Sequence, residues 1–376
     1  MERHGRITAY VDLEAVKFNF ESMRANLAPG TLMIAVIKTD GYGHGAAAIA
    51  KKMEPEEYIW GFAVAAVSEA AALRESGIRK PILILGYTFQ EDYEWMAQNG
   101  VRPVLFTEKM MREFSAAAQV SGVTAPFHTA VDTGMSRIGF ADTRENASLI
   151  AGLSELPSIR LEGIFTHFAR ADEADKKAAQ KQYDRFTTFC GCLKEQLSRD
   201  IICHCANTAA IIDMPEKRLD LVRAGISIYG IYPSDEVDRS RVALRPAMEL
   251  KSHVVYVKEI APGTQISYGG TFTADRPMQI ATIPVGYGDG YPRSLSNKGY
   301  VLIHGQKAWI KGRVCMDQFM VDVTGMDVKI LDEVTLLGKD SGEEITVDEL
   351  GALSGRFPYE FVCDIGRRVP RVYKGI

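Results

Sequence analysis

Apolar and polar residues alternate in blocks along the first part of the chain, and the blocks predict a parallel α/β fold. Short apolar runs fall at residues 32–38, 58–64, 81–86, 102–106, 125–134, 159–169, 201–208 and 221–230. Amphipathic segments lie between most of them, which is typical of parallel βαβ units. Eight such runs favour a (β/α)8 barrel, with an open doubly wound sheet as the alternative. No G-x-G-x-x-G follows the first run, which weakens a dinucleotide-binding interpretation.

The rhythm changes after about residue 236, where short stretches of alternating apolar and polar positions take over. These stretches are 252–260, 278–286, 301–310, 318–324 and 333–338, with Gly- and Pro-containing turns between them. Such alternation is typical of antiparallel strands. We therefore predict a (β/α)8 barrel over residues 1–235 and a mainly antiparallel β-domain over residues 236–376. The loop at 232–246 is the predicted junction.

The length and charge of the chain agree with this division and exclude several classes of function. A chain of 376 residues is longer than a single core usually organises. The net charge of −4 and the pI near 6.0 argue against binding to nucleic acids or anionic membranes. No run of about 18 apolar residues is present, and the N-terminus lacks an apolar signal core. We expect a cytoplasmic protein that has neither a nucleic acid nor a membrane as its partner.

The cysteines do not form a metal-binding pattern. Six are present, and the pairs Cys190/Cys192 and Cys203/Cys205 each have one residue between their members. Structural zinc sites usually leave two to four residues between paired ligands. Free cysteine is also among the most buried residue types. We therefore expect reduced thiols in the core and no metal.

Chemically active side chains follow the apolar runs of the first domain. In a (β/α)8 barrel the active groups lie at the C-terminal ends of the strands. Those ends hold Lys38, Tyr42, Asp132, Arg137, His167, Asn207, Thr208 and Arg223. Lysine is seldom fully buried, so Lys38 directly after LMIAVI is a candidate for a Schiff base. The same ends offer no carboxylate cluster for Mg²⁺, no set of zinc ligands and no G-x-S-x-G elbow.

Each of these residues also has an ordinary structural explanation. The charged end of Lys38 can extend to solvent from the barrel mouth. His167 can be a core histidine with its hydrogen bonds satisfied, and Arg223 can belong to a buried ion pair. A purely structural interpretation needs all these separate explanations to be true at once, whereas a single functional site accounts for all the residues. The functional site is therefore favoured.

Nine short segments combine glycines and polar residues in a fixed order. They read IAVIKTDGYGHG, VDTGMSRIGF, GIFTHFARADEAD, ANTAA, VRAGISIYG, ISYGGTF, PVGYGDGYPR, GRVCMDQFMVDV and RRVPRVY. Together they resemble the alanine racemase family, whose members use pyridoxal 5'-phosphate (PLP). The resemblance extends from about Thr8 to Tyr373 and covers both predicted domains.

The resemblance implies a barrel that carries PLP on Lys38 as an internal aldimine. It also implies a head-to-tail homodimer in which the β-domain of each subunit completes the active site of the other. The further residues implied to bind PLP are Tyr42, His167, Asn207, Thr208, Arg223, Gly225, Ile226 and Tyr359. A glycine just before a helix start lets backbone N–H groups converge on a phosphate, as expected at Gly225.

The implied reaction needs a base on each face of the substrate. A proton must leave one face of a planar carbanion and another must return to the opposite face, while PLP delocalises the charge. The resemblance assigns these roles to Lys38 and to Tyr268 of the other subunit. Tyrosine needs cationic neighbours for this role, and His167 and Arg223 are the candidates. Arg223, which has donors only, would also keep the ring nitrogen unprotonated and limit transamination.

The implied substrate is a small amino acid, alanine first and serine as a secondary substrate. Arg137 and the backbone around Met316 are implied to contact it. The corridor to the site is implied to be lined by Asp172, Tyr287, Arg293 and Arg313. Tyr268 and Tyr359 gate this corridor and leave room for little beyond a methyl group. The implied product is D-alanine for peptidoglycan.

Two positions depart from the family pattern. Ala130 stands where many members carry a lysine that braces the substrate-binding arginine, and Ser136 replaces the commoner glycine. Arg137 must then be oriented by another group, such as a bound anion or water.

Three alternatives remain open at this stage. Two are enzymes on the same scaffold: a serine or broad-specificity racemase, and a basic amino-acid decarboxylase. The third is a non-catalytic PLP carrier. The carrier is disfavoured because such proteins usually end after the barrel and lack the segment around Tyr268.

Overall fold

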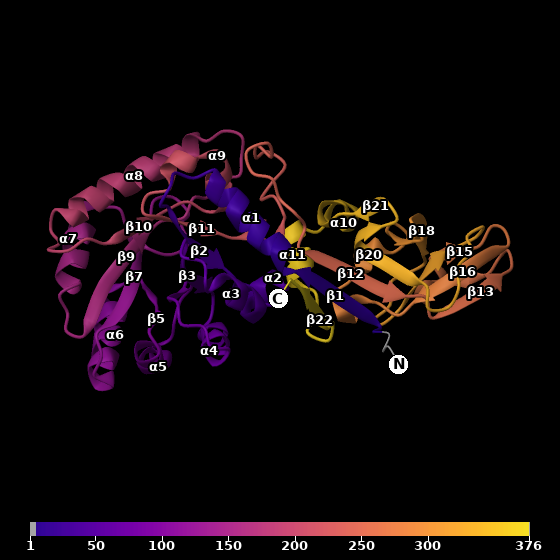
Figure 1. Ribbon diagram of the computed structural model, residues 1–376, viewed down its shortest axis with the longest axis horizontal. Coiled ribbons are helices and arrows are strands. Elements are labelled where there is room, and N and C mark those ends of the chain that lie inside the picture. The colour runs from indigo at the N-terminus through magenta and orange to yellow at the C-terminus, as the bar shows by residue number, and fades with distance from the viewer. Residues whose placement is uncertain (1–4, 376) are drawn as a thin grey trace. The chain divides into compact units, whose positions relative to one another are not determined.

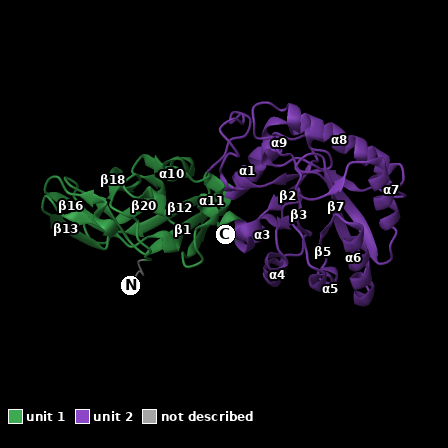
Figure 2. Ribbon diagram, turned by 180° about the vertical axis from the view of Figure 1, so that it is seen from behind, with its two compact units in different colours: residues 1–15, 42–45, 246–376 green, residues 16–41, 46–245 purple. Residues whose placement is uncertain are grey.

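The computed structural model describes residues 5–375, which fall into two compact units. Unit 1 holds residues 1–15, 42–45 and 246–376, and unit 2 holds residues 16–41 and 46–245 (Figure 2). The observed division therefore differs from the predicted boundary at residue 235. Both the N-terminal segment and four residues after Gly41 belong with the C-terminal part of the chain.

Unit 2 is a closed barrel of parallel strands. The strands are β2 (Leu32–Val36), β3 (Ile59–Val64), β4 (Ile82–Ile84), β5 (Val101–Arg102) with β6 (Val104–Leu105), β7 (Ala125–Asp132), β9 (Ile159–Phe165), β10 (Ile202–His204) and β11 (Leu221–Ala224). They pair in the orders β11-β2-β3-β4-β5 and β6-β7-β9-β10. Pro103, which has no N–H to donate, separates β5 from β6. The Arg223 N–H donates to the carbonyl of Ala206 at 2.9 Å and joins β11 to the end of β10. The (β/α)8 prediction is confirmed.

Helices line the outside of the barrel strands (Figure 1). They are α1 (Leu13–Ala25), α3 (Ala46–Met53), α4 (Val67–Glu75), α5 (Tyr93–Gln98), α6 (Glu108–Ser121), α7 (Arg144–Leu153), α8 (Lys177–Lys194) and α9 (Thr208–Asp213). Short elements complete the unit: α2 (Lys38–Tyr42), β8 (Phe140–Ala141), η1 (Gln90–Asp92), η2 (Pro215–Lys217) and η3 (Ile226–Tyr229). The residues at the ends of α6 explain its bounds. The Thr107 hydroxyl accepts the Met110 N–H, and Gly122 ends the helix with a φ of 67°.

The barrel interior contains polar side chains among its apolar ones. His128 on β7 and His204 on β10 are fully buried, and Arg223 on β11 is nearly so. Gly163 on β9 makes room for one of them, because a Cβ there would lie 2.5 Å from Cε1 of His128. Buried polar groups cost free energy unless they are hydrogen-bonded, so their partners are decisive for the site.

Unit 1 is built on one large sheet. Its strands pair in the order β13-β16-β19-β18-β17-β20-β12-β1-β22, and β21 pairs with β20. Their bounds are β1 (Ile7–Asp12), β12 (Met248–His253), β13 (Tyr256–Ile260), β16 (Met278–Ile283), β17 (Tyr300–Ile303), β18 (Gln306–Lys311), β19 (Phe319–Asp322), β20 (Glu333–Asp340), β21 (Glu343–Ile345) and β22 (Arg371–Lys374). All pairs are antiparallel except β1 with β22.

Strand β1 corrects the prediction that residues 1–235 form one domain. Its sequence, ITAYVD, alternates buried and half-buried side chains, as a strand with one covered face does. It pairs with β12 on one side and β22 on the other. The partners of β1 lie more than 230 positions away in the sequence. The local pattern of apolar and polar residues does not reveal such distant pairing, so it groups β1 with the barrel that follows it.

Loops and short helices complete unit 1. They are β14 (Gln265–Ile266), β15 (Phe272–Thr273), η4 (Tyr268–Gly270), η5 (Tyr287–Asp289), η6 (Arg293–Leu295), α10 (Val347–Ser354) and α11 (Pro358–Cys363). Buried Asp289 holds η5 in place. Its carboxylate accepts from Arg368 Nε at 2.7 Å and from the Gly286 N–H at 2.9 Å.

The described residues contain neither a membrane-spanning helix nor a cluster of metal ligands. No helix between residues 5 and 375 is long and apolar enough to cross a membrane. Within the same range, no group of three His, Cys, Asp or Glu side chains is placed to hold a metal ion. All six cysteines are free thiols, of which Cys190, Cys203 and Cys205 are buried.

Candidate active site

Lys38 follows β2 and begins an unusual turn. Residues Thr39, Asp40 and Gly41 have φ values of 53°, 49° and 64° with positive ψ, and Tyr42 has a φ of 51°. The turn is therefore left-handed over four successive residues, three of which are not glycine. A left-handed residue other than glycine costs about 1–2 kcal/mol. Strain of this kind persists only where the surroundings determine it, and it is concentrated at functional sites.

Three hydrogen bonds within unit 2 hold this turn. The Gly41 N–H donates to the carbonyl of Ile37 at 2.8 Å, and the Ala46 N–H donates to Asp40 Oδ1 at 2.9 Å. The Thr39 N–H donates to Glu69 Oε1. Asp40 and Glu69 were not predicted from the sequence, where the glycines and the tyrosine alone drew attention to this loop.

Arg223 is surrounded by hydrogen-bond acceptors rather than carboxylates. Nη1 donates to His204 Nδ1 at 2.8 Å, and Nη2 donates to His167 Nδ1 at 3.1 Å. Nη2 also donates to the carbonyls of Thr166 and Cys205, at 2.9 and 3.0 Å. Within the described residues, no acidic side chain pairs with the guanidinium and Nε has no acceptor. Burial lowers the pKa of Arg223 to about 10, and the charge of Arg137 acts in the same direction. Arg223 therefore stays cationic at neutral pH.

A chain of buried side chains continues from Arg223 through the barrel. His204 Nε2 lies 3.0 Å from His128 Nδ1, and His128 Nε2 lies 3.5 Å from Glu162 Oε2. Arg102 Nε donates to the same carboxylate at 2.9 Å. Because arginine can only donate, His204 Nδ1 must carry no proton. The His204 proton is then on Nε2 and points to His128 Nδ1, which leaves the His128 proton on Nε2. Within the described residues that Nε2 makes no hydrogen bond, and Glu162 is its nearby charge.

Both histidines are neutral in this arrangement. Burial lowers the pKa of His204 well below its ordinary value, and the charge of Arg223 adds to the effect. Burial also lowers the pKa of His128, although Glu162 opposes it. Sequence analysis missed His128, His204 and Glu162. The available signal was a histidine in the middle of an apolar run, which the strands around residues 128 and 204 both contain.

His167, which follows β9, differs from its predicted role. Burial is the largest cause that lowers its pKa to about 3, and the charges of Arg223, Arg137 and Lys38 act in the same direction. The ring accepts from Arg223 on Nδ1, so its proton is on Nε2. The expectation that His167 is a cationic neighbour is therefore wrong. It is a neutral donor, and Arg223 carries the charge.

Asn207 and Thr208 are placed by the start of α9. Asn207 Oδ1 accepts the Ala210 N–H at 3.1 Å and caps the helix. Thr208 Oγ1 accepts the Gly225 N–H at 2.8 Å, so the hydroxyl proton of Thr208 is left to donate to another group. Ile226 begins η3 directly afterwards. The structure brings Thr208 and Gly225 together beside Ile226 and gives Asn207 a capping role.

Tyr42 and Tyr359 are brought together within unit 1. Their ring centroids lie 6.1 Å apart in an edge-to-face arrangement. Burial raises the pKa of Tyr42 well above its ordinary value, so its hydroxyl remains a donor. Gly43 fixes this segment, since a Cβ there would lie 2.1 Å from the carbonyl oxygen of Val362.

A second group of predicted residues gathers on the surface of unit 1. Tyr268 is 72% exposed, Met316 53% and Tyr287 43%. Tyr268, Met316 and five neighbours line a pocket of about 490 Å³. The Tyr287 N–H donates to the carbonyl of Cys315 at 3.0 Å, which ties η5 to the loop between β18 and β19 that holds Met316. The Arg313 side chain lies beside Gly269, at 3.0 Å from the position of its missing Cβ.

The other predicted residues are less tightly placed. Arg137 is exposed, and in the described part of the chain its guanidinium makes no hydrogen bond or ion pair. Ser136 before it has a φ of 56°, where glycine would fit without strain. Ala130 is buried on β7 and has no group with which to orient Arg137. Asp172 lies in unit 2 and Arg293 in unit 1.

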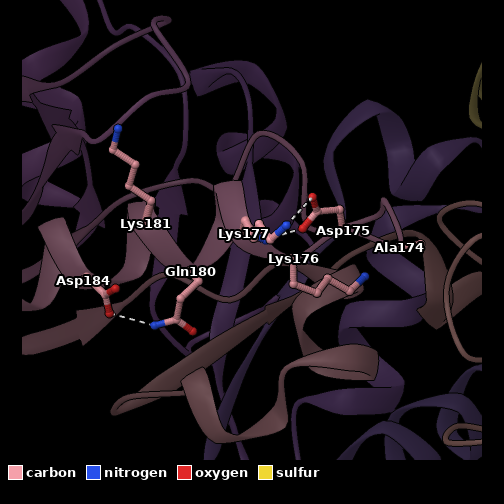
Figure 3. Close-up of a pocket in the computed structure, with 7 residues that line it drawn as sticks. All are labelled: Ala174, Asp175, Lys176, Lys177, Gln180, Lys181 and Asp184. Atoms are coloured by element: carbon pink, nitrogen blue, oxygen red, sulfur yellow. Dashed lines mark hydrogen bonds and ion pairs between the residues drawn. The ribbon is translucent and has the colours of Figure 1, made fainter.

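A surface hollow of unit 2 lies at the start of α8. It has a volume of about 570 Å³ and is formed by residues 174–184 at the start of α8 (Figure 3). Lys176 forms an ion pair with Asp213 at 2.6 Å, and Gln180 donates to Asp184 at 2.7 Å. None of the predicted site residues lines this hollow.

The fold and the site define a class of protein. A lysine and a buried, carboxylate-free arginine at the C-terminal end of a (β/α)8 barrel, followed by a β-domain, are typical of PLP enzymes that act on amino acids. Residues 11–233 match the family model of the alanine racemase N-terminal domain, and residues 247–373 match that of the alanine racemase C-terminal domain. The chain belongs to the alanine racemase family.

Individual alanine racemases are similar to this chain in sequence and structure over almost its whole length. The alanine racemase of Desulforamulus reducens is 44% identical over 98% of this chain and 99% of its own length. The crystal structure of alanine racemase from Clostridium difficile 630 is 40% identical, with a TM-score of 0.95 over 99% of this chain and 97% of that chain. Alanine racemase from Bartonella henselae, solved with covalently bound pyridoxal phosphate, is 28% identical, with a TM-score of 0.84 over 98% and 99%.

The residues present fit PLP, on which the family depends. The hydrogen bonds of Arg223 within the described residues are made by Nη1 and Nη2, which leaves Nε to donate to an unprotonated ring nitrogen. The Thr208 hydroxyl accepts the Gly225 N–H and keeps its own proton to donate, which suits a phosphate. Burial raises the pKa of Tyr42 and so keeps its hydroxyl protonated. Lys38, directly after β2, carries a primary amine of the kind that forms a Schiff base with an aldehyde.

Proposed function

We propose how this member of the alanine racemase family, a PLP-dependent enzyme that interconverts L-alanine and D-alanine, divides the reaction among its residues. Lys38 of one subunit and Tyr268 of the other act as the two bases. The observation that carries this proposal is the arrangement around Arg223, a buried cation with neutral histidines on both sides and a donor on Nε. When bound, PLP supplies the electron sink for the α-carbanion.

The cofactor contacts are assigned to unit 2 and to the segment after Lys38. Lys38 holds the cofactor covalently and Arg223 Nε donates to its ring nitrogen. The phosphate is bound by the hydroxyls of Thr208 and Tyr42 and by the Ile226 N–H, with Tyr359 beside Tyr42. His167 lies at the ring, and Asn207 keeps α9 in place under the phosphate.

Lys38 and Tyr268 move protons on opposite faces of the substrate. Lys38 takes up or returns the proton on its own face once its amine is released. Tyr268 does the same on the other face. His167, as a neutral donor, can stabilise the phenolate through its Nε2–H, and the charge of Arg223 favours the same anion.

Arg223 limits the reaction to proton transfer. It remains cationic and has no proton acceptor, so it holds the ring nitrogen unprotonated. The electron sink is then weaker and the carbanion shorter-lived. We expect this to suppress transamination and decarboxylation.

A homodimer explains the exposed surface of unit 1. Tyr268 and Met316 are too exposed to work on a substrate in water, and a second subunit would enclose them. The substrate carboxylate is assigned to Arg137 and the backbone at Met316. Asp172, Tyr287, Arg293 and Arg313 line the corridor.

Substrate and cellular role follow from family membership. The relatives named above are all alanine racemases, which favours alanine over a serine or broad-specificity racemase. We further propose that the enzyme acts in the cytoplasm and supplies D-alanine for peptidoglycan.

Two measurements on purified protein test the proposal. The holoenzyme should absorb near 420 nm, as a lysine-bound PLP does, and should form D-alanine from L-alanine faster than D-serine from L-serine. Lys38→Ala should lose both properties. Absence of the band would contradict the cofactor assignment. A band without racemisation would favour a non-catalytic carrier.

A further inference from the structure

Glu69 has a conventional structural role on α4 (Val67–Glu75). It stands at the third position of the helix, where a glutamate often accepts the N–H of the residue that caps the helix. Its Oε2 accepts the N–H groups of Ala65 at 2.8 Å and Ala66 at 3.2 Å. The cap position is Ala66, whose side chain has no acceptor. Glu69 therefore provides the side-chain acceptor at this helix start.

The second oxygen of Glu69 serves a different element. Oε1 accepts the N–H of Thr39, which lies 30 positions earlier in the chain and directly after Lys38. Strands β2 and β3 are parallel neighbours, with Val36 opposite Ala63, so their C-terminal ends lie at the same edge of the barrel. One carboxylate thus joins the start of α4 to the turn that carries Lys38.

This turn has a specific need for an anchor. Its first residue after the lysine, Thr39, has a φ of 53° and is not glycine. Without a fixed acceptor for its N–H, the backbone at Thr39 can relax toward an ordinary right-handed or extended conformation. Such relaxation rotates the peptide that sets the direction of the Lys38 side chain. The Gly41 N–H bonds to the carbonyl of Ile37 across this peptide, and Asp40 accepts the Ala46 N–H further along the turn. The bond to Glu69 is the one that the Thr39 N–H itself makes.

We propose that Glu69 is a positioning residue that fixes the left-handed turn and thereby the place of the Lys38 amine. The inference rests on the proposed role of Lys38 as the attachment point and base. The rival explanation is that Glu69 is only a helix cap.

Two substitutions separate the carboxylate's functions. Glu69→Ala removes both acceptor oxygens. Glu69→Gln keeps one oxygen, and its amide NH2 must then face either the Thr39 N–H or the N–H groups of Ala65 and Ala66. The second variant therefore disturbs the same contacts with little change in volume.

Thr107→Ala is the matched control. Thr107 is exposed and caps α6 through the Met110 N–H, far along the chain from Lys38. Its loss weakens a barrel helix in the same manner and leaves the Lys38 turn intact. It reports what the loss of a cap alone does to the enzyme.

The readouts are the melting temperature, kcat and KM for both alanine enantiomers, and the rate of cofactor attachment. Attachment is followed by the return of the absorption near 420 nm when PLP is added to stripped full-length protein. In that step the Lys38 nitrogen forms a C=N bond to the aldehyde carbon and the aldehyde oxygen leaves as water. Its rate depends on where the amine lies.

We expect Glu69→Ala to lower kcat by about 10- to 100-fold and to slow attachment by a similar factor, with KM changed by less than about 3-fold. For Glu69→Gln, both kcat and the rate of attachment should lie between the values of Glu69→Ala and the wild type. Thr107→Ala should lower the melting temperature and leave kcat and attachment unchanged.

Wild-type kcat and attachment in both Glu69 variants would overturn the proposal and leave Glu69 as a cap. If Glu69→Ala does not fold, the kcat and attachment rate of Glu69→Gln decide alone: wild-type values overturn the proposal and lowered values support it. Failure of the proposed function is a separate result, since the wild type would then show neither the absorption band nor racemisation.

Discussion

The two groups of residues assigned to the active site are built in opposite ways. In unit 2, Arg223 is 3% exposed, and His128 and His204 are completely buried in a hydrogen-bonded chain. In unit 1, Tyr268 is 72% exposed and Met316 is 53% exposed. The buried groups that set charge and protonation therefore find their hydrogen-bond partners within a single chain. The groups proposed to contact the substrate are exposed to solvent in the single chain, and we propose that a second subunit covers them.

This difference determines how each region should respond to substitution. A buried, hydrogen-bonded group contributes to both stability and chemistry, because its removal leaves partners unsatisfied. An exposed group contributes little to stability, so its removal affects chemistry alone. Substitutions in unit 1 and in unit 2 should therefore differ in their effect on stability.

The largest effect is expected from Tyr268→Phe. The hydroxyl is exposed, so the melting temperature should not change, whereas kcat should fall by roughly 10²- to 10⁴-fold for the loss of a proton-transferring group. Exchange of the α-proton should be impaired more for one alanine enantiomer than for the other, as measured in D2O by NMR. Tyr256→Phe, at a residue 53% exposed in the same unit, is the control and should leave kcat unchanged. Equal impairment of exchange for both enantiomers would rule out a two-base mechanism.

A smaller effect is expected in unit 2 from the pH dependence of stability. The folded chain keeps His128 and His204 neutral, because burial holds both pKa values below the ordinary value of about 6.5. Below about pH 6.5 the unfolded chain binds protons on these histidines and the folded chain does not. The free energy of unfolding should therefore be highest above that pH. It should fall on acidification with a slope that approaches about 1.4 kcal/mol per pH unit for each histidine.

Denaturant unfolding between about pH 7.5 and about pH 5 measures this slope, above the range in which most carboxylates titrate. His204→Asn removes one of the two groups and should reduce the slope by about half of their joint contribution. An unchanged slope in that variant would contradict the neutral hydrogen-bonded chain.

The sequence was sufficient for the fold class and for most of the residues at the barrel mouth. Apolar runs repeat at the spacing of βα units, and residues after them must lie at one edge of a parallel barrel. Lys38, His167, Thr208 and Arg223 were found in this way. Strand β1 was misassigned because its pairing partners lie more than 230 positions away in the sequence.

The missed residues share a physical cause. His128, His204 and Glu162 act through one another, and their relation depends on which strands are neighbours inside the barrel. Glu69 looks like any helical glutamate until the backbone of Thr39 is placed beside it. The protonation of His167 could not be assigned from sequence, since it depends on burial and on the direction in which Arg223 donates.

The central claim is that each active site combines the barrel of one subunit with Tyr268 of another. Mixing Lys38→Ala with Tyr268→Phe, under conditions that allow subunit exchange, tests this claim most directly. Each variant alone should be inactive or nearly so. If the sites are shared, about half of the dimers are hybrids and each hybrid has one intact site, so racemisation should recover to about a quarter of the wild-type rate. No recovery in a mixture that contains hybrid dimers would show that Lys38 and Tyr268 serve the same site from a single chain, or that Tyr268 is not the second base.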